Sequence, residues 1–318
     1  MDDLTLPPDA PFTVAVVGAT ATGKSDLALE LALALGGEVV NADAMQLYRG
    51  MDVGTAKLAP DERRGVPHHL LDVLDVTQEA SVAAYQRDAR AALARIAGRG
   101  GVPVLAGGSG LYVRAVLERL EIPPTDAAVR ARLEGELAAA GPGALHQRLA
   151  AVDPVAAASI LPTNGRRVVR ALEVVELTGR PFSATLPEPG AAPAVPSVQL
   201  GLRLERADLD ARIDARVDRM WAGGLVAETR ALAGRGLREG RTASRALGYA
   251  QVLRFLAAEW DEAEARADTK AATRRFARRQ ETWFRRDRGI VWLPADAPDL
   301  RERALAAVAA AGRPRDRA

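Results

Sequence analysis

The sequence predicts an α/β fold, in which a parallel sheet is flanked by helices and interrupted by an inserted all-helical domain. Three observations support this prediction: short apolar segments alternate with helical segments in the N-terminal third, a glycine-rich loop joins the first strand to the first helix, and a long middle segment lacks β-branched clusters. Alternation of this kind is typical of doubly wound sheets, whose ligands lie at the carboxyl ends of the strands.

The first strand, TVAVV at about 13–17, runs directly into GATATGKS at 18–25 and then into a helical segment. Glycine, four residues, glycine, lysine and serine is the spacing of a phosphate-binding loop, so the fold is expected to be P-loop NTPase-like. Lys24 would place its charge on the phosphates, and the Ser25 hydroxyl would be a ligand of Mg²⁺. A simple glycine turn is the alternative, but the flanking strand and helix favour a phosphate site lined by Gly18, Ala19, Thr20, Ala21, Thr22, Gly23, Lys24 and Ser25.

A second apolar segment, EVVNAD, ends in Asp43, and a third, VPVLAGG, ends in glycine at 107, with helical spacing between them. If Asp43 lies near the phosphate loop, it could accept a proton from an attacking nucleophile. The alternative is an aspartate that caps a turn. GGSGLY at 107–112 supplies a second glycine-rich turn, with the hydroxyl of Ser109.

From about Glu121 the chain becomes rich in alanine, leucine and arginine, and PP, GPG and DP punctuate it. The proline-rich segment PEPGAAPAVP then ends this unit, and VQLGLRL resumes an apolar strand. We therefore expect a catalytic core formed by residues 1–120 and 198–318, with a helical insertion at 121–197.

Two arginine-rich segments later in the chain suggest an anionic partner. Arg212 and Arg216 share one helix face and could bind a diphosphate. KAATRRFARRQETWFRRDR carries eight basic and two acidic residues. On a helix its arginines form two neighbouring stripes, with Phe276 and Trp283 expected to be buried on another face: Arg274, Arg278 and Arg285, and then Arg275, Arg279 and Arg286.

A solvated helix face is the simpler explanation of such a charge run, but alternating acidic partners are nearly absent from the sequence. An arginine stripe backed by aromatic residues suits the backbone phosphates of a nucleic acid, and RRVVR at 166–170 adds a second cluster. The formal net charge is only +2, so a polyanion would be bound by these local clusters.

Composition excludes several other classes. The chain has no cysteine, so it forms no disulfide and no thiolate site, and its three histidines make a zinc enzyme improbable. His68 and His69 would point to opposite sides of an extended segment, which favours a hydrogen-bonded loop, and His146 has no companion. The acidic, proline-rich N-terminus does not resemble a signal peptide, and no apolar run reaches the length of a membrane span, so we expect a cytoplasmic protein.

Several motifs in order resemble those of one family, the tRNA dimethylallyltransferases, over nearly the whole chain. They are GATATGKS, NADAMQLYRGMDVGTAK, VPHHLLDV, GGSGLYVRA, NGRRVVRALEV, RIDARVDRM with GGLVAE, RALGYAQ and the ARRQETWFRR run. In the phosphate loop, the family commonly has proline where this chain has Ala19 and serine where it has Thr22. In the second glycine-rich turn, it commonly has threonine where this chain has Ser109. Thr22 and Ser109 therefore keep a hydroxyl at their positions. Gly165 replaces the Asp-Pro or similar residues that relatives often have before the RR pair.

The resemblance implies transfer of a dimethylallyl group from dimethylallyl diphosphate to the N6 amine of adenosine 37 in tRNA, with release of diphosphate. Asp43 would be the general base, while Thr20, Arg216 and the phosphate loop with Mg²⁺ would stabilise the leaving group. The implied protein is a monomer. Residues at which similar proteins bind the tRNA would be Asp43, Ala44, Met45, Gln46, Ser109, Arg166, Arg167, Arg170, Arg245, Gly248, Tyr249, Arg278 and Arg279.

Three alternatives stay open on the sequence. An isopentenyltransferase acting on free adenine nucleotides would need no arginine-rich surface. A small-molecule kinase would turn over ATP, although VPVLAGGSG ends in glycine and serine where a magnesium-directing aspartate is usual. An RNA-binding switch would use a bound nucleotide only to change shape.

Overall fold

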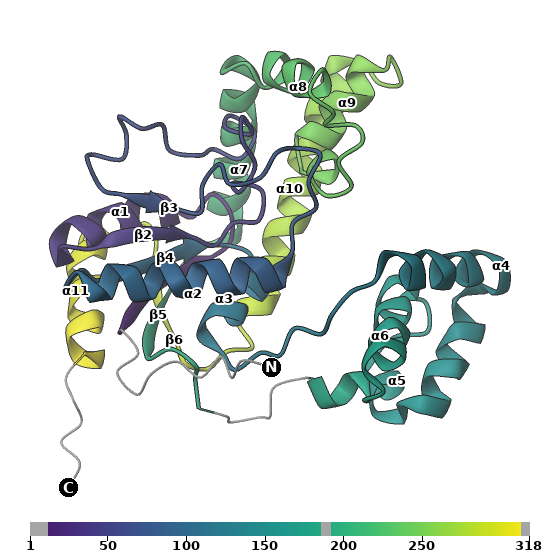
Figure 1. Cartoon of the computed structure of the whole chain (residues 1–318). Coiled ribbons are helices and arrows are strands. Elements are labelled where there is room, and N and C mark those ends of the chain that lie inside the picture. Colours follow the sequence, from purple (N-terminus) through teal and green to yellow (C-terminus); the bar gives the residue numbers. More distant parts are fainter. Residues whose placement is uncertain (1–11, 186–191, 313–318) are drawn as a thin grey trace, which may run out of the picture. The chain divides into compact units, whose positions relative to one another are not determined.

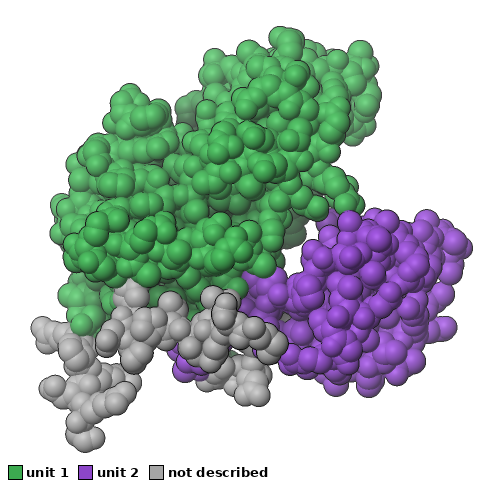
Figure 2. All heavy atoms as spheres, viewed as in Figure 1, with its two compact units in different colours: residues 1–117, 194–318 green, residues 118–193 purple. Residues whose placement is uncertain are grey.

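The computed structural model describes residues 12–185 and 192–312 and divides into two compact units (Figure 2). One unit comprises Met1–Leu117 with Ala194–Ala318, and the other comprises Glu118–Pro193. These limits lie three or four residues from the limits 121 and 197 that the sequence suggested. The N-terminal segment 1–11 and residues 186–191, which include the first half of the proline-rich segment, lie outside the described residues.

The larger unit is built on a six-stranded parallel sheet of order β3-β2-β4-β1-β5-β6 (Figure 1). The strand β1 lies inside the sheet, and chain order reverses beside it, which is where ligands bind in such sheets. The two-residue strand at the edge was not predicted, because the sequence suggested a loop there. The strands are β1 (Thr13–Gly18), β2 (Glu38–Asn41), β3 (His68–His69), β4 (Pro103–Gly107), β5 (Ser197–Arg203) and β6 (Ile290–Pro294).

Register brings three strand ends to one edge of the sheet. Val17 pairs with Gly107, and Gly18 with Leu202, while Asn41 pairs with Ala106 on the neighbouring strand. All six residues of β1 are buried, as expected for a parallel strand covered on both faces. The loops that leave β1, β2 and β4 therefore start side by side.

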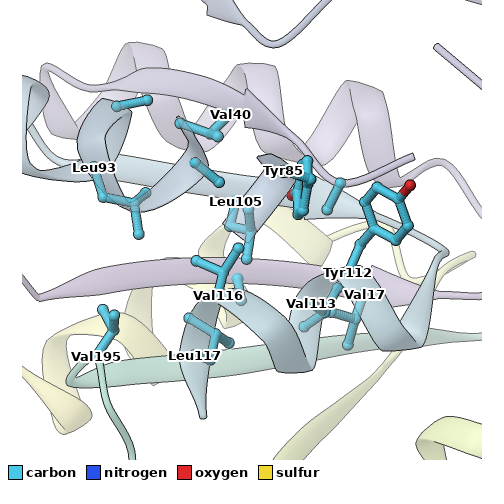
Figure 3. Close-up of a cluster of buried hydrophobic side chains, with 14 of the residues drawn as sticks. Val17, Val40, Tyr85, Leu93, Leu105, Tyr112, Val113, Val116, Leu117 and Val195 are labelled. Atoms are coloured by element: carbon cyan, nitrogen blue, oxygen red, sulfur yellow. The ribbon is translucent and has the colours of Figure 1, made fainter. Parts of the chain in front are cut away.

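Helices cover both faces of the sheet. The helices α1 (Lys24–Leu35) and α11 (Leu300–Ala311) pack with Val14 and Val16 on one face. On the other face α2 (Val82–Gly98) and α3 (Gly110–Leu117) bury Ala15 and Val17, in the cluster shown in Figure 3. Alternate residues of β1 thus serve opposite faces, as the twofold periodicity of a strand requires.

A third layer of helices lies over the long loop after β2. This loop contributes the fully buried Tyr48 and Met51, which pack with Trp221, Leu225 and Tyr249. The core of this layer therefore joins an N-terminal loop to the C-terminal third. Its helices are α7 (Arg206–Ala222), α8 (Leu225–Ala233), α9 (Tyr249–Leu256) and α10 (Glu262–Phe284), with a 3₁₀ turn at η2 (Ala243–Arg245).

The smaller unit is helical throughout and has its own core. Within α4 the backbone of Gly141 is non-helical, so the GPG sequence divides this helix by a kink. The helix α6 begins at Gly165, and Asn164 caps it by accepting a hydrogen bond from the Arg167 N–H. A Cβ at Gly165 would lie 2.8 Å from the Leu137 side chain, so glycine lets the two helices approach closely. Its elements are α4 (Ala127–Val152), α5 (Pro154–Ser159), α6 (Gly165–Thr178) and η1 (Phe182–Thr185).

A buried carboxylate joins α4 to α6 in this unit. Glu173 is fully buried and accepts hydrogen bonds from Arg130, Arg170 and the Asp126 N–H. Burial alone would raise its pKa, but the hydrogen bonds from Arg170 and Arg130 outweigh burial and hold that pKa below its usual value. Among the described residues, no helix is both long enough and apolar enough to span a membrane.

We expect Leu149→Ala to lower the free energy of unfolding of the helical unit by about 2–5 kcal/mol, because Leu149 is fully buried in its core. Thermal unfolding followed by circular dichroism measures the loss. Leu161→Ala is the matched control, since Leu161 is 72% exposed and its truncation should change stability by less than about 0.5 kcal/mol. Equal effects of the two changes would contradict the packing described here.

Candidate active site

The phosphate loop, residues 18–25, begins where β1 meets its neighbour β5. Gly18 has φ +137°, and a Cβ there would lie 2.7 Å from the Leu202 carbonyl oxygen, so only glycine fits. The Thr22 hydroxyl and the Lys24 ammonium both donate to the Ala19 carbonyl, at 2.8 and 2.5 Å. These bonds curl the loop over the N-terminus of α1, where the first backbone N–H groups of a helix are suited to bind an anion.

Lys24 shares its surroundings with Arg216 and Asp43. Burial and, to a smaller extent, the positive charge of Arg216 lower the pKa of Lys24 from 10.5 to about 7, and the negative charge of Asp43 opposes both effects. Burial also lowers the pKa of Arg216, and Asp43 again raises it. The structure thus gathers two partly buried cations and one carboxylate from separate parts of the sequence.

Arg216 reaches this site from the middle of α7. Its Nη2 donates to the Thr55 carbonyl oxygen at 3.3 Å, and the same oxygen accepts a hydrogen bond from Gln46. Arg212, which the sequence paired with Arg216 as a donor, is exposed. The arginine of the same helix whose positive charge lowers the pKa of Arg216 is Arg219, not Arg212.

Asp43 lies two residues beyond the end of β2 and not at its end, as the sequence suggested. Its N–H donates to Asn41 Oδ1, and its own Oδ1 accepts from the Met45 N–H, both at 2.9 Å. The Asn41 side chain also donates to the carbonyl oxygens of Asp43 and Leu70. Oδ2 accepts no hydrogen bond from the described residues, so one carboxylate oxygen of a fixed side chain is available for chemistry.

Two buried tyrosines line the interior side of this turn. The Tyr85 hydroxyl donates to the Asn41 carbonyl oxygen at 2.9 Å, and its ring centroid lies 4.3 Å from that of Tyr112 (Figure 3). Burial raises the pKa of Tyr85 far above its usual range and that of Tyr112 to about 12. Both phenols are therefore neutral. Tyr85 supports the backbone before Asp43, and neither phenol acts as a base beside that carboxylate.

The turn after β4 supports the Asp43 loop from the opposite side. Ser109 donates its N–H to the Ala42 carbonyl and accepts from the Ala44 N–H through its hydroxyl, both at 3.3 Å. A Cβ at Gly107 would lie 2.2 Å from the Ala42 carbonyl oxygen, so the two loops meet only because this residue is glycine. Ser109 thus lies beside Asp43, and the hydroxyl shared by serine and threonine at this position serves as the acceptor.

Gln280 of α10 is a buried contact of the phosphate loop that the sequence did not suggest. Its Oε1 accepts from the Thr20 N–H at 2.8 Å, and its Nε2 donates to the Gly108 carbonyl at 2.9 Å. The only available sign in the sequence was a neutral amide within a run of arginines.

Glu228 of α8 is a second contact that sequence reasoning missed. Its carboxylate accepts from the backbone N–H groups of Asp52, Val53 and Gly54, and from the Tyr249 hydroxyl at 2.6 Å. Tyr249 has no exposed surface, so its side chain holds the loop that carries the Thr55 carbonyl and is not free for RNA.

The arginine-rich segment forms most of α10, but its faces differ from the predicted stripes. Trp283 is 38% exposed and not buried, and it lines a surface pocket with Arg278, Arg279, Thr282 and Arg286. The guanidinium of Arg279 lies over the Phe276 ring, 5.6 Å from its centroid. Trp283 lies on the outer surface because the next residue, Phe284, occupies the buried position.

Two of these arginines have acidic partners that lie outside the arginine-rich segment, one on α7 and one earlier on α10. Arg274 binds Asp214 of α7 at 2.5 and 2.7 Å, and Arg275 lies 3.6 Å from Asp268. The expectation that the run lacks acidic partners was therefore wrong for these two residues. Within the described residues, no ion pair occupies Arg278, Arg279 or Arg286. The first two are exposed on α10, and Arg286 is exposed in the turn that follows it.

The other predicted RNA contacts are distributed over both units. Arg166 and Arg167 are exposed on α6, whereas Arg170 binds Glu173 and the carbonyl oxygens of Pro123 and Pro124. In the larger unit Arg245 is exposed, Gly248 is buried, and Ala44, Met45 and Gln46 are partly buried. Arg170 therefore serves the helical unit's own structure.

The histidines serve local structure. His68 Nδ1 lies 2.9 Å from the Val66 carbonyl oxygen, His69 Nε2 lies 2.6 Å from a Glu38 carboxylate oxygen, and His146 lies against two carbonyl oxygens between α4 and α5. Each histidine thus has one ring nitrogen in contact with an oxygen of the fold itself.

Comparison with known proteins identifies the family. The family model described as IPP transferase matches residues 46–287. The chain belongs to the IPP transferase family. Among curated relatives, a tRNA dimethylallyltransferase of Salinispora arenicola is 68% identical over 94% of this chain and 87% of its own length, and one of Thermobifida fusca is 64% identical over 93% of both.

Solved structures of the IPP transferase family have the same fold. The tRNA isopentenylpyrophosphate transferase of Bacillus halodurans aligns with a TM-score of 0.68 at 39% identity, covering 94% of this chain and 96% of its own. A eukaryotic dimethylallyltransferase, described as acting on tRNA, aligns with a TM-score of 0.77 at 26% identity, covering 90% of this chain and 74% of its own. The P-loop-like parallel sheet with flanking helices is thus confirmed.

We expect the affinity for inorganic pyrophosphate to fall as the pH rises above about 7, because Lys24 loses its proton near that pH and only the ammonium attracts the anion. Pyrophosphate itself gains charge over the same range, so its own ionisation works in the opposite direction. Isothermal titration calorimetry between pH 6 and 9 measures the trend.

The control for this measurement is Lys24→Met. This variant should bind pyrophosphate weakly, and its affinity should not fall as the pH rises above about 7. A similar decrease in the methionine variant would mean that another group causes it.

Proposed function

We propose that this protein transfers the dimethylallyl group of dimethylallyl diphosphate to the N6 amine of adenosine 37 in tRNA. The observation that carries the proposal is that a fixed carboxylate, Asp43, shares one site with Lys24 and Arg216 beside a phosphate loop. A base next to an anion cradle is what alkyl transfer from a diphosphate requires. The names of the relatives, tRNA dimethylallyltransferases, support the same reaction.

In the proposed reaction the N6 nitrogen bonds to the allylic carbon as the bond from that carbon to the diphosphate oxygen breaks. The electron pair of the broken bond leaves with the diphosphate, and the N6 proton passes to Asp43. Asp43 is suited to this role because hydrogen bonds to Asn41 and Met45 fix its position while Oδ2 stays available.

Charge develops on the diphosphate during this step, and the cations of the site are placed for it. Lys24 and Arg216 are desolvated before the substrate arrives, so their interaction with a growing negative charge is stronger than it would be in water. The Thr20 and Thr22 side chains belong to the same loop. The diphosphate would in turn raise the pKa of Lys24 and keep it protonated.

The residues present are compatible with Mg²⁺. Ser25 is exposed at the start of α1, and no cluster of three or more carboxylate or histidine groups suited to a metal exists among the described residues. Mg²⁺ commonly uses one or two protein ligands and completes its shell with phosphate oxygens and water. We propose that Ser25 supplies the protein ligand, and that the ion when bound would neutralise diphosphate charge.

For RNA, we propose that exposed arginines on both units contact the backbone of the anticodon stem-loop. Arg278 and Arg279 lie on α10, Arg286 lies in the turn that follows it, and Arg166 and Arg167 lie on α6. The N6 amine of a stacked base is out of reach, so the nucleotide must be flipped into the site. A monomeric, cytoplasmic protein is part of the same proposal.

A small-molecule kinase is the second candidate because the phosphate loop by itself would serve ATP equally well. Incubation with unmodified tRNA, Mg²⁺ and labelled dimethylallyl diphosphate, with labelled ATP in parallel, distinguishes the two. Nucleoside analysis should find label as N6-isopentenyladenosine from the prenyl donor only. ATP turnover with unlabelled RNA would support the kinase.

We expect Asp43→Asn to lower kcat by about 10²- to 10⁴-fold, because the amide keeps the turn but cannot accept the N6 proton. Single-turnover transfer assays measure the rate. The Kd for tRNA, measured by filter binding, should stay within about threefold. Undiminished transfer would remove Asp43 from the role of base, and tRNA binding without transfer in the unmodified protein would favour an RNA-binding switch.

A further inference from the structure

Gln280 differs from its neighbours on α10 in exposure and in direction. Arg278 and Arg279 are exposed, whereas Gln280 is 6% exposed and lies against the phosphate loop. A buried amide needs partners for both its oxygen and its nitrogen. Here both partners are backbone groups of loops that the proposed reaction uses.

These two hydrogen bonds connect segments that are far apart in the chain. Thr20 is 260 residues from Gln280 in sequence, and Gly108 is 172 residues from it. The orientation of the amide is fixed by chemistry, because an N–H can only donate and a carbonyl can only accept. One side chain thus joins the phosphate loop to the turn that carries Ser109.

Packing around these bonds leaves Gln280 little freedom. A Cβ at Gly108 would lie 2.3 Å from Gln280 Nε2, so this glycine makes room for the amide. One helical turn earlier, Ala277 packs with Ala19 of the phosphate loop and with Leu209 and Ile213 of α7. The helix therefore contacts two consecutive residues of the loop, one through apolar packing and one through a hydrogen bond.

We propose that Gln280 is a positioning residue that holds the phosphate loop in its anion-binding geometry and fixes it relative to the Ser109 turn. Its bond uses the Thr20 N–H, so this group is not available to a phosphate oxygen, and the donors that remain are those of the later loop residues and Lys24. A loop held in place before binding loses less conformational freedom when the anion arrives. The proposal deepens the proposed function, because it concerns the same diphosphate site.

The decisive variant is Gln280→Met, which keeps the approximate size of the side chain and removes both hydrogen bonds. The probe is inorganic pyrophosphate with Mg²⁺, measured by isothermal titration calorimetry on the full chain. We expect its Kd to rise about tenfold, the effect of losing one or two net hydrogen bonds. In transfer assays KM for dimethylallyl diphosphate should rise by a similar factor, with kcat and the Kd for tRNA within about threefold.

The matched control is Gln86→Met in α2. Gln86 is 7% exposed and donates to the Ala115 carbonyl, but it lies in the core beneath α3 and away from the loop. Both variants should lose comparable thermal stability, and only Gln280→Met should weaken pyrophosphate binding at a temperature where both are folded. A Kd within twofold of the unmodified protein for Gln280→Met, or equal weakening in both variants, would overturn the proposal.

Gln280→Glu adds a second test of the same bond pair. It keeps the acceptor for Thr20 but places carboxylate charge against the Gly108 carbonyl and near the diphosphate, so we expect weaker pyrophosphate binding than in Gln280→Met. Binding as tight as in the unmodified protein would contradict the role of the Nε2 donor. These binding results are independent of prenyl transfer: absence of transfer in the unmodified protein would reject the proposed function and leave the role of Gln280 to be decided by pyrophosphate alone.

Discussion

The close approach of β1, β2 and β4 at their carboxyl ends is the constraint on which the site depends. Glycine at 107 lets β4 approach Ala42 after β2, and glycine at 18 lets β1 approach Leu202 of β5, at distances that any side chain would prevent. The three loops that leave these strands therefore begin side by side. The phosphate loop, Asp43 and the Ser109 turn are neighbours because the strands that precede them end at the same edge of the sheet.

The electrostatic character of the site follows from this crowding. Lys24 and Arg216 are both desolvated and repel each other, and Asp43 offsets this repulsion only in part. Such an arrangement is costly in the free protein and favourable once an anion with several negative oxygens is bound. The site therefore interacts more favourably with the negative charge of a departing diphosphate than with solvent. Such prearranged charges stabilise the negative charge that develops during a reaction.

The C-terminal third of the chain holds the N-terminal loops in place. Gln280 binds the phosphate loop, Glu228 binds three successive backbone N–H groups after β2, and Arg216 binds the Thr55 carbonyl. Loops of this length are otherwise mobile elements, and function requires their side chains to be fixed. The outer face of α10 meanwhile presents Arg278, Arg279 and Trp283, so one helix has an inner supporting face and an outer basic face.

The sequence by itself determined the α/β class and the phosphate-loop spacing, and it marked Asp43 as a candidate base, because each depends on residues that are adjacent in the chain or follow a local period. Only the tertiary structure decided which distant groups join them. Neighbouring residues in the sequence do not reveal the partners of Gln280 and Glu228 or the pairing of Arg274 with Asp214, and the exposure of Trp283 depends on how α10 is rotated against the rest of the core. Hydrogen bonds and ion pairs between remote segments depend on packing in three dimensions, and no periodicity along the chain records them.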